Sequence, residues 1–170
     1  MRSGSILSLG RVGREFDSGQ VAKILYGSII VLALEVALED HPPPPPEVIG
    51  SIVGTAFAVM LAELYSDVIA LELGKRRRVR RGELGAISRK TSAVGFGAVF
   101  PVLWFALAWA GVMGTGTAFA VSKWSGLGLI GFYGFTAGRL AGNGLVRSLV
   151  QAAAVVIVGF VIISVKALFH

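Results

Sequence analysis

The chain has 170 residues, of which 54% are hydrophobic and only 15% are charged, and it contains no cysteine. With a mean hydropathy of +0.74, this composition is too apolar for the surface of a soluble domain and predicts an integral membrane protein. The absence of cysteine excludes disulfides, thiolate metal sites and cysteine nucleophiles. The net charge of +6 comes largely from a basic stretch beside an apolar segment, which favours lipid head groups over nucleic acid as its partner.

Residues 1–19 form the first predicted segment, a cytoplasmic stretch that is too polar after Leu9 to supply the core of a cleaved signal peptide. The first predicted transmembrane helix covers about residues 21–39, the length that spans a bilayer. It ends before Pro42–Pro46, because a proline run cannot continue a helix and forms an extended spacer.

Four more apolar segments are long enough to span a bilayer. Glu47 suits the start of the second helix, Gly74 is its predicted C-cap, and Pro101 predicts a kink in the third helix. We therefore expect an all-α bundle of five transmembrane helices in one domain, residues 20–170, whose later helices cover about residues 47–73, 91–112, 117–137 and 145–168.

The positions of the cations predict the orientation of this bundle. If the N-terminus is cytoplasmic, 14 of the 16 Lys and Arg residues fall on the cytoplasmic side, and eight of them lie between Lys75 and Lys90. The excess of cations on one side predicts a cytoplasmic N-terminus, an external C-terminus and a location in the cell membrane.

Small residues recur at helical spacing on two of the predicted helices. In lipid, close approach of helix backbones through small residues holds a bundle together. We expect these ridges to pack within the chain, with a dimer face as the alternative and a homo-oligomer as the expected assembly. They consist of Gly50, Gly54 and Ala58, and of Gly134, Gly138 and Gly142.

Carboxylates inside the apolar segments are the main candidates for function. Glu63 lies about 24 Å along the second helix, in the cytoplasmic half of the membrane, with Asp67 one turn beyond it and Met60 one turn before it. Two neighbouring carboxylates favour a shared proton or a bound cation, and oxygen ligands with one thioether suit a divalent metal ion. Tyr65 and Ser66 are the predicted supporting residues.

A further acid, Glu35, lies about 22 Å from the cytoplasmic end of the first helix, in the outer half. It is a second candidate metal ligand, and its alternative role is an ion pair with Lys123. The alternative for Asp67 is an ion pair with Arg139, Arg147 or the basic stretch. The charged residues around the proline run are expected to be solvated: Glu39, Asp40, His41 and Glu47.

The basic stretch KRRRVRRGELGAISRK is expected to contact anionic head groups at the cytoplasmic face. The arginines assigned to this contact are Arg76, Arg77, Arg78, Arg80 and Arg81. No GxSxG, HExxH or P-loop motif is present, and no nucleophile and base can be assembled, so the sequence predicts a protein that is not an enzyme.

The chain has five predicted helices, a long acidic second helix, and the stretches GAVFPVLWFAL and GFYGFTAGRLAGNGLVRSLVQAAAVVIVGFVI. Together these features resemble the vacuolar iron transporter family. The resemblance covers roughly Ser92 to Ile163 and implies a dimeric exchanger of divalent cations and protons. The first helix has Tyr26-Gly27 where the family has an Asp-Gly pair, so that acid is absent here. Two interpretations follow: a small cation transporter or channel, or a non-catalytic accessory subunit with structural ion pairs.

Overall fold

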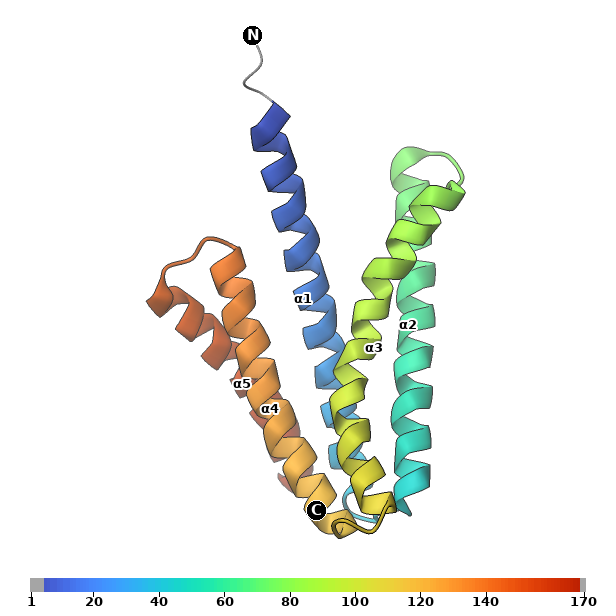
Figure 1. The fold of residues 1–170 in the computed structure, drawn as a ribbon, viewed down its shortest axis with the longest axis vertical. Coiled ribbons are helices and arrows are strands. Elements are labelled where there is room, and N and C mark those ends of the chain that lie inside the picture. Colours follow the sequence, from blue (N-terminus) through green and yellow to red (C-terminus); the bar gives the residue numbers. More distant parts are fainter. Residues whose placement is uncertain (1–4, 169–170) are drawn as a thin grey trace.

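The chain forms five long helices in the computed structural model, which describes the backbone of residues 5–168 and the side chains of residues 20–165. The helices are α1 (Ser5–Leu38), α2 (Pro45–Lys75), α3 (Arg81–Trp109), α4 (Thr115–Leu140) and α5 (Leu145–Leu168). Successive helices run in opposite directions (Figure 1), and the described residues contain no strand. The predicted all-α architecture of five helices is confirmed.

Two helices extend well beyond their predicted apolar spans. α1 begins at Ser5 rather than near residue 21, and α3 begins at Arg81 rather than near residue 91. Hydropathy indicates which residues suit contact with lipid. It does not indicate where a helix begins, because polar residues also form helices. Residues 1–4 of the predicted N-terminal segment lie outside the described part.

The turns around α2 also differ from the prediction. Pro45 and Pro46 form the first turn of the helix instead of belonging to the spacer, because the fixed φ of proline suits that position. Gly74 lies within the helix, and the residue that caps its C-terminus is Arg76, in a left-handed conformation with φ 49°. The predicted cap at Gly74 was therefore wrong.

Four segments of the described chain are long and apolar enough to cross a membrane: residues 20–38, α2, α3 and residues 145–165. α4 contains Lys123 and six glycines within Thr115–Leu140, so it is less apolar than predicted. It packs against α1, α3 and α5, and its buried residues include Ser122, Gly134 and Gly138.

The helices approach most closely where α1 crosses α3. A Cβ atom added to Gly27 would lie 2.2 Å from the carbonyl oxygen of Val94, and one added to Gly97 would lie 2.6 Å from the backbone nitrogen of Ser28. A buried cluster extends this contact toward the α1–α2 and α3–α4 connections, where the rings of Phe105 and Phe119 meet edge to face at 4.7 Å. α1 also contacts α4, α2 and α5, so it touches all four of the other helices.

The two small-residue ridges have different surroundings. Gly134 and Gly138 face Ala152 and Ser148 of α5 at 3.0–3.2 Å from an added Cβ, which confirms packing within the chain for these two residues. Gly142 lies beyond the end of α4, with φ 80° and nothing within 4 Å of an added Cβ. Gly50 and Gly54 on α2 have nothing within 4 Å of an added Cβ. This second ridge does not pack within the chain, because its surface faces away from the other helices.

The connections divide between the two ends of the bundle. The start of α1, the α2–α3 turn and the α4–α5 turn lie at one end, and the α1–α2 and α3–α4 connections lie at the other (Figure 1). The predicted cytoplasmic loops therefore share one end. This end is called the basic end below.

Candidate functional site

Lys23 of α1 binds two acids of α2, Glu63 and Asp67. Its ammonium group donates a hydrogen bond to the carboxylate of Glu63 and a second one, of 2.6 Å, to Asp67. The side chains are partly buried, with exposed fractions of 19% for Lys23, 25% for Glu63 and 40% for Asp67. One lysine thus faces two carboxylates, which leaves this set of three with a net charge of −1 when all are ionised.

The partner of Asp67 differs from the predicted ones. Asp67 binds Lys23, whereas Arg139 instead donates a hydrogen bond to the backbone carbonyl of Asn143. Lys23 is the residue of this candidate site that the sequence did not indicate, because it is one of many cations on the predicted cytoplasmic side. A comparison of positions along the helices would have found it, because Lys23 near the start of the first apolar span lies at the level of Glu63.

A half-open hollow of about 310 Å³ adjoins this ion-pair set between α1 and α2. Ser66 lines it together with both carboxylates, Tyr26, Val59 and Ala62. Tyr65 is not part of its lining and is 69% exposed. Both carboxylates therefore border an open hollow and are not fully enclosed by protein.

The side chains of Met60, Glu63 and Asp67, which were predicted to share one face of the second helix, contact two different helices. The sulfur of Met60 lies against Gly95 of α3, 2.8 Å from an added Cβ, whereas the carboxylates turn toward Lys23 of α1. Within residues 20–165, no three His, Cys, Asp or Glu side chains gather to hold a metal ion.

Glu35 is the most deeply buried acid, with an exposed fraction of 2%. Its carboxylate accepts a hydrogen bond of 2.7 Å from the hydroxyl of Ser122 on α4. Lys123 donates instead to both carboxylate oxygens of Glu39, one turn further along the chain, at 2.7 Å. The alternative role predicted for Glu35, an ion pair with Lys123, was therefore wrong by one helical turn, and Glu39 is not simply solvated.

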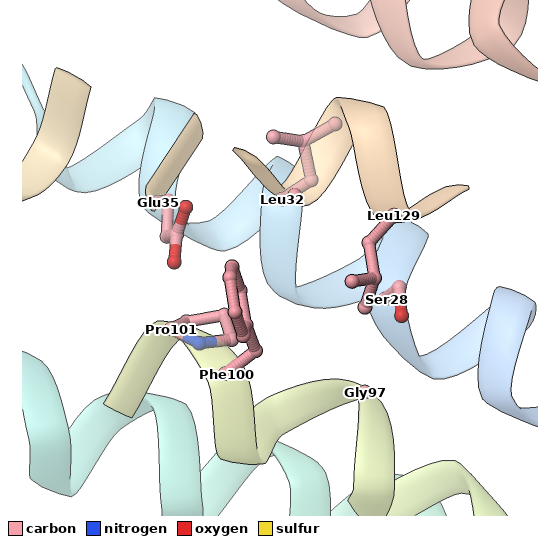
Figure 2. Close-up of a pocket in the computed structure, with 8 residues that line it drawn as sticks. Ser28, Leu32, Glu35, Gly97, Phe100, Pro101 and Leu129 are labelled. Atoms are coloured by element: carbon pink, nitrogen blue, oxygen red, sulfur yellow. The ribbon is translucent and has the colours of Figure 1, made fainter. Parts of the chain in front are cut away.

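Glu35 borders a small cavity between α1, α3 and α4 (Figure 2). Ser28 lies toward its opposite end, and Gly97 and Pro101 form the wall contributed by α3. About 10 Å³ is available to the centre of a water molecule, which is room for about one water. The seven-residue spacing of Ser28 and Glu35 puts both on one face of α1, and this spacing is the signal that could have indicated Ser28.

The polar residues of α1 thus form an ordered series along the helix. Lys23 and its two carboxylates lie toward the basic end, Ser28 and the cavity follow, and Glu35 and Glu39 lie toward the other end. α1 therefore makes polar contacts at several levels along its length.

No protein-family model, curated protein or solved structure matches this chain. The resemblance to the vacuolar iron transporter family stays a prediction that rests on the residues quoted above.

Proposed function

We propose that the chain is a small multi-pass membrane protein that transports cations, and that the proton is the cation that its groups suit best. The observation that carries this proposal is the burial of Glu35, which lies 2% exposed within an apolar helix. A charged side chain within a bilayer is costly, by about 2.5–3.5 kcal/mol at the centre on a lenient scale and less toward the surface, and such residues mark ion pathways and proton relays.

The surroundings of Glu35 favour a proton over a metal ion. The carboxylate has a neutral hydroxyl, Ser122, as its hydrogen-bond partner, and a cavity with room for one water beside it. A hydroxyl and a water molecule can each accept and donate a proton. Divalent ions such as Mg²⁺ or Ca²⁺ require about six oxygen ligands, which this site does not offer.

The two ends of the series would load and release the ion. At the basic end, the net charge of −1 on Lys23, Glu63 and Asp67 attracts a proton or cation into the adjoining hollow. At the other end, Lys123 and Glu39 form a partly buried ion pair next to Ser122 and Glu35. With the basic end in the cytoplasm, as the cation distribution favours, the route runs from Glu63 and Asp67 inward to Glu35 and outward to Glu39.

A second candidate function is that of an accessory membrane subunit without transport. The observation that favours it is the pairing of both α2 acids with a fixed lysine. In this case Lys23 joins α1 to α2, Lys123 joins α1 to α4, and the bundle presents the open ridge of α2 to a partner or to a second copy.

Proteoliposomes that contain a pH-sensitive dye distinguish the two functions. With an imposed pH gradient and membrane potential, the native chain is expected to carry protons faster than empty vesicles do. Glu35→Gln is expected to reduce that flux at least tenfold, because the amide cannot accept a proton in the relay. Glu47→Gln is the matched control, since Glu47 is exposed at the start of α2, and its flux should equal that of the native chain.

Absence of proton flux in the native chain, or unchanged flux in Glu35→Gln, would contradict proton transport. The same vesicles loaded with a divalent-cation indicator test the metal interpretation with Mn²⁺ as the probe. Circular dichroism of each variant shows whether the helices are retained.

A further inference from the structure

The α2–α3 turn at the basic end contains a residue in the left-handed conformation. α2 ends at Lys75, Arg76 turns the chain with φ 49°, and α3 begins at Arg81. A residue other than glycine is uncommon in this left-handed conformation and costs free energy there. The surrounding contacts must therefore stabilise the turn.

Two acids supply those contacts. Glu83 accepts hydrogen bonds from Lys75 at 2.7 Å, from the guanidinium of Arg77 at 2.7 and 2.9 Å, and from the backbone nitrogen of Arg80 at 3.0 Å. Glu72 accepts one from the backbone nitrogen of Val79 at 3.1 Å. Both carboxylates of the turn are thus used to close it.

The turn keeps a large positive charge after these contacts are made. Residues 72–83 include six cations and two acids. Arg76, Arg78 and Arg81 are exposed, and the ion pairs of the turn join only Lys75 and Arg77 to an acid. Several guanidinium groups on one short turn suit an anion, because their bidentate hydrogen bonds match phosphate oxygens.

An apolar surface lies directly beside these arginines. Ile69 and Leu73 of α2, which are 37% and 75% exposed, line an open hollow of about 340 Å³ together with Glu72, Arg76, Arg77 and Arg78. A free anion such as phosphate would gain nothing from the leucine and isoleucine. An amphiphile would gain from both parts of the hollow.

We propose that this hollow binds the head group of an anionic phospholipid. Arg76 and Arg78 contact the phosphate, while Leu73 contacts the glycerol and the first carbons of an acyl chain. Arg77 is held in place by Glu83 and so lines the hollow in a defined orientation. The proposal rests on the turn alone and stands whether or not the bundle transports ions.

The test uses the purified chain in detergent, titrated with a short-chain phosphatidylglycerol and with the matching phosphatidylcholine, with binding followed by native mass spectrometry. Phosphatidylglycerol is expected to bind, and Arg76→Gln/Arg78→Gln to weaken that binding on the order of 25-fold, from about fivefold for each cation near a lipid surface. Leu73→Gln is expected to weaken it as well. All three side chains are exposed, so the fold should persist, and circular dichroism checks this.

Arg89→Gln/Arg147→Gln removes the same charge from exposed positions outside the hollow and is expected to change the affinity less than threefold. An equal loss in this control, or equal binding of phosphatidylcholine, would overturn the proposal. Displacement of the lipid by millimolar inorganic phosphate, combined with no effect of Leu73→Gln, would also overturn it, because the site would then recognise a free anion.

Discussion

Gly27→Ala is expected to destabilise the bundle more than any other single methyl group added to the described helices. The new Cβ would lie 2.2 Å from the carbonyl oxygen of Val94 and 3.0 Å from its carbonyl carbon. These are backbone atoms of a helix interior, which cannot move aside as a flexible side chain can. Relief requires α1 and α3 to separate, and overpacking of this kind costs about 1–3 kcal/mol or more.

The expected result is a drop in the midpoint of thermal unfolding on the order of 5–10 °C. Size-exclusion chromatography of the heated protein in detergent measures this midpoint. Gly54→Ala is the matched control, because nothing lies within 4 Å of its added Cβ. It should leave the midpoint unchanged or raise it slightly, since alanine favours a helix by up to about 1 kcal/mol over glycine. Equal midpoints for the two variants would show that the α1–α3 crossing is looser than described.

Lys23→Met is expected to produce the second large loss of stability. It would leave Glu63 and Asp67 without their cation in a partly buried place. Removing one partner of a buried ion pair costs about 3–5 kcal/mol. Because these carboxylates are 25% and 40% exposed, solvent screens them, and a smaller loss of about 1–3 kcal/mol is expected.

The triple variant Lys23→Met/Glu63→Gln/Asp67→Asn separates lost charge pairing from lost packing. It removes all three charges at nearly constant volume, so it should recover most of the stability that Lys23→Met loses. Thermal unfolding in detergent measures both variants, with Lys75→Met as the control on the exposed turn. If the triple variant is as unstable as Lys23→Met, the lysine acts through its hydrocarbon stem rather than its charge.

The sequence predicted helices best where an apolar run ends at a turn residue. The predicted bounds of α5, 145–168, match the observed helix, and those of α2 and α4 agree within three residues at each end. The polar starts of α1 and α3 were not predicted, because hydropathy indicates which residues suit lipid and not where the backbone stops being helical.

Partners across helices were the least predictable part of the candidate site. Glu63, Asp67 and Glu35 were recognised as acids within apolar segments, but their observed partners are Lys23 and Ser122. Glu35 and Ser122 are 87 residues apart, and their contact depends on how α1 and α4 rotate against each other. A serine in a glycine-rich helix carries no charge pattern that would mark it as the partner of a carboxylate.

The ion pairs of α1 also set the thickness of the hydrocarbon layer that this helix matches. Lys23 and Glu39, each in a charged pair with a neighbouring helix, are separated by a rise of only about 24 Å. The hydrocarbon layer of a typical bilayer is about 30 Å thick. The resulting hydrophobic mismatch would be relieved by local thinning of the bilayer, at a modest cost per ångström. Lipids with shorter acyl chains should therefore be the better solvent for this protein.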